Sequence, residues 1–191
     1  DVGAWALQLD VAIAAHNGDS GLPCPAYSAT VAGSDGLTVR HLSAFSFAPS
    51  VSDLQVHADQ SCAALSADGS IPPCIGGHFE TRNLAISGWY VDQQSSESDL
   101  PSLRRYTLVS SGLLQNQEIM PGIENLQIML GVDRDADAVI DGFVGPHEIG
   151  GADVLAVHIT LQAVGADRDV GGAPLRASAE RLFALRNYVP V

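Results

Sequence analysis

Residues 121–144 read PGIENLQIMLGVDRDADAVIDGFV, and this stretch carries the strongest indications of fold and of function in the chain. It begins with a short strand-like run, Ile123–Leu130, and then opens onto four aspartates: Asp133, Asp135, Asp137 and Asp141. Because the first three are two residues apart, a tight loop brings their carboxylates together. Like charges at that distance oppose folding unless water or a cation compensates them.

The spacing of these aspartates is typical of a calcium-binding loop. Calcium prefers carboxylate oxygens at the first, third, fifth and ninth loop positions and a backbone carbonyl at the seventh. Counted from Asp133, the carboxylate positions fall on Asp133, Asp135, Asp137 and Asp141, and the carbonyl belongs to Val139. The pattern therefore predicts a structural calcium site, and a solvated acidic turn is the alternative.

Two positions depart from an EF-hand loop. Val144 stands where a bidentate carboxylate is required, and Ala138 stands where glycine is required. Glu148, or Glu124 from the preceding strand, is therefore expected to complete the ligand shell from outside the loop.

The rest of the chain after residue 20 has the composition of an antiparallel β-protein. Alternating or β-rich segments predict strands at Leu37–Leu42, Asp53–His57, Leu84–Val91, Leu103–Val109 and Val154–Val164, besides Ile123–Leu130. Clusters of Gly, Ser, Pro and Asp predict loops at 18–25, 66–77, 92–102 and 165–174. Arg181–Arg186 is compatible with a final strand or with a helical turn.

The N-terminal segment has the spacing of an amphipathic helix. An apolar stripe consists of Val2, Trp5, Ala6, Leu9 and Ile13, and Asn17–Gly18 supplies a stop. A helix followed by antiparallel strands predicts an α+β fold in which the helix packs on the sheet. The chain is expected to start inside this helix, with something upstream removed or left out.

Composition excludes several functions. The 191 residues suit one domain and include 22 acidic residues against nine arginines and no lysine, for a net charge of −13. The missing lysine excludes Walker and Schiff-base chemistry within this sequence. The acidic balance argues against nucleic acid as a partner, because binding it requires basic patches.

The three cysteines form an odd set, and a disulfide among them would fit an oxidising compartment. Cys62 and Cys74 flank a loop rich in turn formers, which makes them candidates for a disulfide. Cys24 would then be free, or would replace one of the two, because sequence does not assign connectivity. No spacing of cysteines and histidines indicates a structural zinc site.

Catalytic signatures are missing from the sequence. It contains no Gly-x-Ser-x-Gly elbow, no His-Glu-x-x-His and no Gly-x-Gly-x-x-Gly. His147 and His158 are isolated and are interpreted as solvated or hydrogen-bonded side chains. The chain is therefore predicted not to be an enzyme. An acidic periplasmic hydrolase would require a cleft with paired carboxylates or a histidine beside an acid.

Several blocks, taken in order, resemble PilW-type minor pilins of the bacterial type IV pilus, which are related to pseudopilin J of type II secretion. The blocks are Gly3–Asp10, Ser34–Arg40, Pro121–Gln127, Gly131–Asp137, Val154–Ile159 and Phe183–Asn187. The family pattern G-[VI]-E-N-[LM]-Q followed by Y-G-V-D-T-D-G-D-G is the most specific. This sequence departs from it at Leu130, Ala136 and Ala138, which stand where the family has tyrosine and glycines.

The resemblance implies a pilin-like fold, with residues 1–18 as the end of the N-terminal helix and 19–191 as the β-rich domain. It implies an inner-membrane anchor through a helix absent from this sequence, and a periplasmic and then extracellular pilus location. The implied partners are other minor pilins and the major pilin, in a complex that primes pilus growth near its tip. Twitching motility and adhesion are the processes such a subunit supports. A secreted calcium-stabilised β-domain, either an adhesin or a carbohydrate-binding module, is the alternative.

Overall fold

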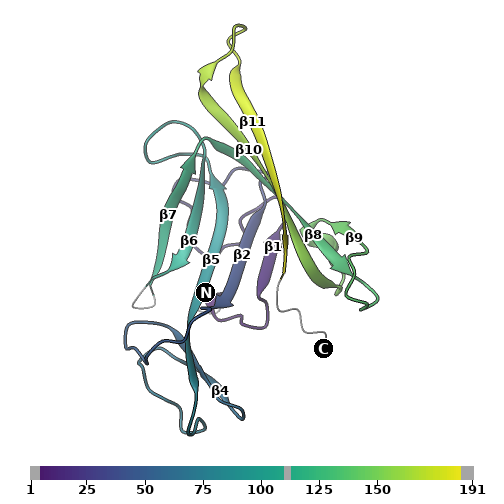
Figure 1. Ribbon diagram of the computed structural model, residues 1–191. Coiled ribbons are helices and arrows are strands. Elements are labelled where there is room, and N and C mark those ends of the chain that lie inside the picture. Colours follow the sequence, from purple (N-terminus) through teal and green to yellow (C-terminus); the bar gives the residue numbers. More distant parts are fainter. Residues whose placement is uncertain (1–4, 110–112, 186–191) are drawn as a thin grey trace.

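The computed structural model describes residues 5–109 and 113–185, which form two antiparallel sheets (Figure 1). The larger sheet contains β1 (Ile13–His16), β2 (Gly36–Leu42), β3 (Gln55–Ala58), β4 (Ala63–Ser66), β5 (Glu80–Asp92), β6 (Ser102–Leu108) and β7 (Leu114–Pro121). The smaller sheet has the order β11-β10-β8-β9, from β8 (Ile123–Asp133), β9 (Gly142–Val144), β10 (Asp153–Arg168) and β11 (Pro174–Ala184). A short 3-10 helix, η2 (Pro146–Glu148), follows β9.

The predicted N-terminal helix, and with it the α+β class, is wrong for the described residues. Between residues 5 and 18, only Trp5 and Ala6 have helical backbone, and β1 pairs antiparallel with β2, placing Ile13 opposite Val39. The fold is therefore nearly all β. Residues 1–4 of the predicted helix lie outside the described residues.

A buried arginine accounts for this difference. The guanidinium of Arg40 donates to the carbonyl oxygen of Trp5 at 3.1 Å through Nε and to that of Val11 at 2.9 Å. In a helix these carbonyls would accept from backbone N–H groups four residues on. Arg40 lies on β2, so a side chain distant in sequence replaces the helical hydrogen bonds.

The strands predicted from sequence all overlap observed strands, and the main differences lie near the C-terminus. β10 continues to Arg168 through part of the predicted 165–174 loop, and β11 begins at Pro174. β1, β4 and β9 have no counterpart among the predicted strands, and neither has β7. Its cross-strand partners on β6 include Arg104 and Arg105.

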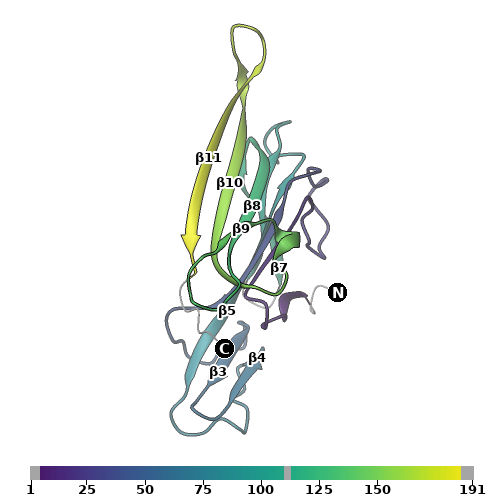
Figure 2. The same cartoon turned by 90° about the vertical axis from the view of Figure 1, so that its right-hand side faces the viewer.

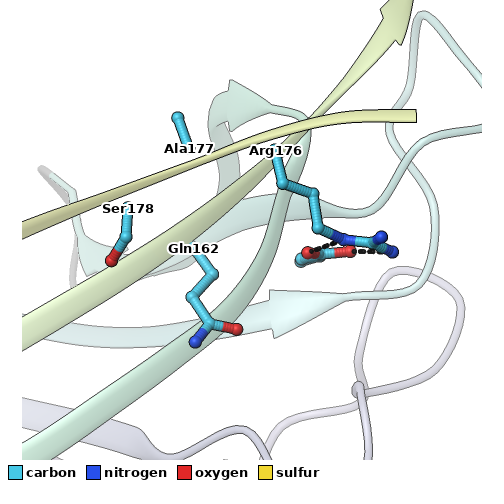
Figure 3. Close-up of a pocket in the computed structure, with 5 residues that line it drawn as sticks. Gln162, Arg176, Ala177 and Ser178 are labelled. Atoms are coloured by element: carbon cyan, nitrogen blue, oxygen red, sulfur yellow. Dashed lines mark hydrogen bonds and ion pairs between the residues drawn. The ribbon is translucent and has the colours of Figure 1, made fainter. Parts of the chain in front are cut away.

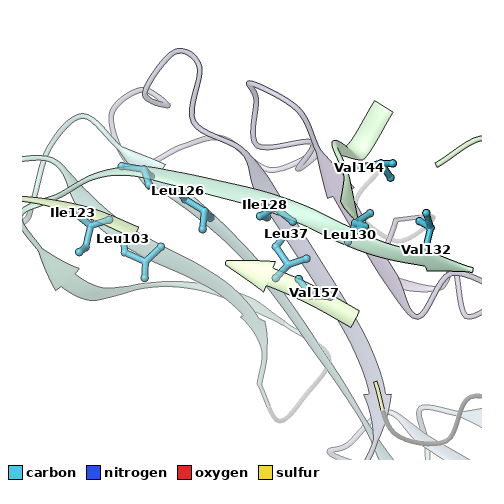
Figure 4. Packing of buried hydrophobic residues seen from close by; sticks show 10 residues of the cluster. Leu37, Leu103, Ile123, Leu126, Ile128, Leu130, Val132, Val144 and Val157 are labelled. Atoms are coloured by element: carbon cyan, nitrogen blue, oxygen red, sulfur yellow. The ribbon is translucent and has the colours of Figure 1, made fainter. Parts of the chain in front are cut away.

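Alternate residues of β8 form the core between the sheets. Leu126, Ile128, Leu130 and Val132 are all at most 3% exposed. Figure 4 shows them in a row along β8, and Leu37 of β2 and Leu103 of β6 belong to the same cluster. Burying one side chain of this kind contributes roughly 1.5–3 kcal/mol. This row fixes which face of β8 points inward.

Asp35, just before β2, ties that strand to β8. Its Oδ1 accepts a hydrogen bond from the backbone N–H of Gly18 at 2.8 Å, and its Oδ2 accepts one from that of Ile128 at 2.8 Å. The hydroxyl of the preceding Ser34 accepts from the N–H of Leu126 at 3.1 Å. Buried backbone donors require partners of this kind. These two side chains therefore satisfy an edge of β8 that β9 does not reach.

Burial decreases across the smaller sheet from β8 to β11. Leu126 of β8 is buried, its β10 neighbour Leu161 is partly buried, and the next residue along that row, Ala179 of β11, is exposed. Figure 2 shows the β10–β11 hairpin extending beyond the rest of the molecule. The larger sheet thus leaves β11 uncovered.

The β3–β4 ribbon lies at the opposite end of the molecule from that hairpin (Figure 1). A disulfide joins Cys62, in the turn between β3 and β4, to Cys74 in the loop after β4, whereas Cys24 is free. Asp59 organises the adjoining loop, since its carboxylate accepts hydrogen bonds from the N–H groups of Gly76, Ser61 and Cys62. These bonds, that from Gly76 first, lower the pKa of Asp59 to about 2.

Candidate functional site

The aspartate loop connects β8 to β9 and is organised by its first acidic residue. Asp133 ends β8 and is 2% exposed. Its Oδ1 accepts from the N–H of Asp135 at 3.2 Å and of Ala136 at 2.8 Å, and its Oδ2 accepts from the N–H of Ala138 at 2.8 Å. One buried carboxylate therefore holds the backbone of the whole turn.

Three of the four predicted aspartates converge. Carboxylate oxygens of Asp133, Asp135 and Asp141 all lie within 4.8 Å of one another. Asp137 is outside this group, and its Oδ1 accepts from the N–H of Val139 at 2.8 Å. Three converging carboxylates can hold a hard divalent cation. The calcium ligand set itself stays a prediction.

The charges in the loop oppose one another. The carboxylate of Asp137, followed by burial and by Asp141, raises the pKa of Asp135 above its ordinary value. Burial also raises the pKa of Asp133, but the backbone hydrogen bonds from Ala138, Ala136 and Asp135 outweigh it, so that this pKa lies below its ordinary value. A bound cation would relieve the repulsion at Asp135.

The two alanines in the loop adopt backbone angles that favour glycine. The φ angle is 60° at Ala136 and 65° at Ala138. Such a conformation costs a residue with a Cβ atom roughly 1–2 kcal/mol. These are the positions where the PilW pattern has glycine. The loop therefore has a backbone conformation that suits glycine, although alanine occupies both positions.

Removing and restoring calcium tests the loop. If it binds calcium, the midpoint of thermal unfolding should rise when calcium replaces EDTA, because a ligand of the folded state stabilises it by about 2.7 kcal/mol at 100 times its Kd. Asp135→Ala should abolish the rise. Asp137→Ala should preserve much of it, since this carboxylate lies outside the convergent group. Equal midpoints in EDTA and in millimolar calcium would identify a solvated acidic turn.

Beside the loop, the outward face of the smaller sheet carries exposed apolar side chains. We define the outer apolar patch as Met129, Ile140, Phe143 and Leu182, all of which are exposed. Met129 and Leu182 lie on either side of His158 in one cross-strand row, and the His158 ring packs edge-on against Phe143, 6.1 Å between centroids.

Gly131 allows this patch to form. A Cβ atom at Gly131 would lie 3.1 Å from a ring carbon of Phe143 and 3.2 Å from Cδ1 of Ile140. The absence of a side chain thus lets both residues pack against the strand. The sequence interpretation missed the patch. The sequence pattern that could have revealed the patch is the alternation of β8, which places Met129 and Gly131 on the face opposite Ile128 and Leu130.

The described surface offers little that resembles a catalytic cleft. One surface pocket of about 320 Å³ is lined by Glu124, Gln162, Arg176, Ala177 and Ser178 (Figure 3). Its two charged residues neutralise each other, with Arg176 Nε 2.8 Å from Glu124 Oε1. His158 lies 3.4 Å from Glu180 on the surface.

Residues 88–181 match the family model of PilW, the type IV pilus-assembly protein W. These residues are a PilW region. The resemblance expected from the sequence is thereby confirmed over just under half of the chain. Comparisons with curated proteins and with solved structures give no match.

The PilW region contains the aspartate loop and most of the outer apolar patch, since Leu182 alone lies one residue beyond it. It implies involvement in type IV pilus assembly and suggests interaction with other pilus components. A PilW region also suggests a structural or assembly role rather than a catalytic one, and a periplasmic or pilus-associated location. None of the described helical segments has the length and apolarity needed to cross a membrane.

Proposed function

We propose that the chain is a minor-pilin subunit that takes part in priming pilus assembly, at or near the pilus tip, through contacts with other minor pilins. The observation that carries this proposal is the PilW match over residues 88–181. That stretch includes all of β6 to β10, and therefore one wall of the core and the surfaces beside it.

The outer apolar patch supports a role in protein contacts. Its four members come from β8, the aspartate loop, β9 and β11, and lie together on one face. Contiguous exposed apolar side chains rimmed by polar ones are typical of protein interaction sites. Here the rim is the aspartate loop on one side and the polar row Gln127, Thr160 and Glu180 on the other.

Phe143→Asp tests this proposal in cells that assemble pili with this protein. The substitution places a charge in the centre of the outer apolar patch, where a contacting subunit would have to bury it. We expect most surface pili to disappear in electron micrographs, and the variant no longer to retain other minor pilins in affinity purification. The purified variant should keep a folded β-protein spectrum.

Phe45→Asp is the matched control, because Phe45 is an exposed phenylalanine outside the PilW region. It should leave the number of pili unchanged. The proposal fails if cells lacking the gene make normal pili. Retention of the wild-type protein on carbohydrate instead of on pilins would support the adhesin or carbohydrate-binding alternative.

A further inference from the structure

β11 is a long free edge of the smaller sheet. Eleven residues form the strand, and all except Pro174 are exposed. Among the described residues, β10 is the only strand that pairs with it. An edge strand presents unpaired N–H and C=O groups at every second residue, which can pair with another chain.

The charges on this edge are symmetric about one residue. Arg176 and Glu180 lie two positions on either side of Ser178 and share its face, since side chains of a strand alternate. Both are largely exposed, at 60% and 71% of the side chain. Arg176 pairs with Glu124, whereas the one ion pair of Glu180 among the described residues is with His158, so that its carboxylate can take a further cationic partner.

This symmetry matches a second copy of the chain. In an antiparallel pair related by a twofold axis through Ser178, Arg176 stands opposite Glu180 of the second copy, and Glu180 stands opposite its Arg176. Opposite charges placed directly across a sheet stabilise it. On the other face, Ala177 stands opposite Ala179 of the second copy, so small side chains meet there without a clash.

Neighbouring registers lose this complementarity. An axis through Ala179 places Arg176 opposite Leu182, and an axis through Ala177 places Glu180 opposite Pro174. We propose that the chain forms a homodimer by antiparallel pairing of two β11 strands, with Ser178 on the twofold axis. The two smaller sheets then become one continuous sheet across both copies. This inference is independent of the proposed role in pilus assembly.

Cysteine cross-linking tests the register. In a Cys24→Ser background, Ser178→Cys places two thiols opposite each other at the axis, whereas Leu182→Cys places them eight residues out of register. Mild oxidation should cross-link the Ser178→Cys protein rapidly and the Leu182→Cys protein no faster than Val170→Cys. Val170 is a fully exposed residue in the β10–β11 turn and reports random collision. Equal rates for all three variants would overturn the proposal.

Charge reversal tests the same contact without a thiol. Glu180→Arg replaces each of the two Arg176–Glu180 pairs of the dimer with a pair of arginines. The repulsion should raise the dimer Kd about tenfold or more in sedimentation equilibrium. Glu97→Arg, at an exposed loop position, makes the same change in net charge and is the matched control. Because either variant reduces the net charge of −13, a general charge effect would strengthen association in both. A wild-type protein that stays monomeric up to about 100 μM would refute the dimer.

Discussion

Replacing Arg104 with methionine is expected to lower the free energy of unfolding by about 3–5 kcal/mol, the usual cost of leaving one member of a buried ion pair alone. Arg104 and Glu118 are 5% and 14% exposed, and their N and O atoms are 2.9 Å apart. Arg104 Nε also donates to Asn116 at 3.0 Å, and its guanidinium lies 4.0 Å from the ring centre of Tyr27. Urea unfolding of both proteins measures the difference.

Arg105→Met is the matched control for this prediction. Arg105 is the next residue on β6 and contacts an uncharged partner, with NH2 2.8 Å from Gln117 Oε1. Its removal leaves no buried carboxylate unpaired, so we expect a loss below about 1 kcal/mol. Similar losses for the two variants would mean that the Glu118 carboxylate does not depend on Arg104.

The same pair predicts a pH dependence. Burial raises the pKa of Glu118, but hydrogen bonds from Ser96 and Ser95 and the charge of Arg104 outweigh it, so the pKa lies below its ordinary value. A carboxyl with a lowered pKa in the folded state stabilises that state fully above its unfolded pKa. This contribution should therefore disappear as the pH falls below 4.5. In Glu118→Gln it should be missing at every pH.

Asp35→Ala is expected to cost about 2–6 kcal/mol, because it leaves two backbone N–H groups without an acceptor and each unsatisfied donor costs roughly 1–3 kcal/mol. The groups belong to Gly18 and Ile128, on the two sides of the connection between the sheets. Asp35 is 2% exposed, so water does not easily replace the carboxylate. For a protein of this length, each kcal/mol shifts the unfolding midpoint by roughly 2–4 °C.

Asp19→Ala provides the comparison, since Asp19 accepts from the N–H of Gly21 at 2.7 Å in an exposed turn. It should change the midpoint by no more than a degree or two, in keeping with surface substitutions. If Asp35→Ala is equally mild, the link from Asp35 to β8 does not hold the sheets together.

The central strands were predictable because their patterns are local. The run before the aspartates becomes β8, and its alternation continues from Leu126 to Val132 as one inward face. The prediction for the N-terminal segment was wrong because the apolar spacing of its first thirteen residues also fits a helix. The backbone conformation of this segment depends on Arg40, whose position relative to Trp5 is set only by the fold.

β7 illustrates a second limit of sequence interpretation. Leu114–Pro121 is rich in Gln, Asn and Glu, which strands usually disfavour. Its stability comes from polar pairs with β6, such as Arg104 with Glu118 and Arg105 with Gln117. Cross-strand pairs of this kind appear only when the partner strand and its register are known.

The candidate site was predictable to a similar degree. Spacing alone brought Asp133, Asp135 and Asp141 together, but it did not indicate that Asp137 would turn to the N–H of Val139. The outer apolar patch requires knowledge of which face of β8 is buried, and Phe143 joins it from a strand of three residues.

The decrease of burial from β8 to β11 has a consequence for motion. Local unfolding costs least where few apolar contacts are lost, so in the monomer amide hydrogens of β11 should exchange with solvent long before those of β8. The smaller sheet is thus rigid along β8, which Asp35 fastens, and more easily deformed at the β11 edge. The β11 edge can therefore adjust its twist to an incoming strand while the core keeps its packing.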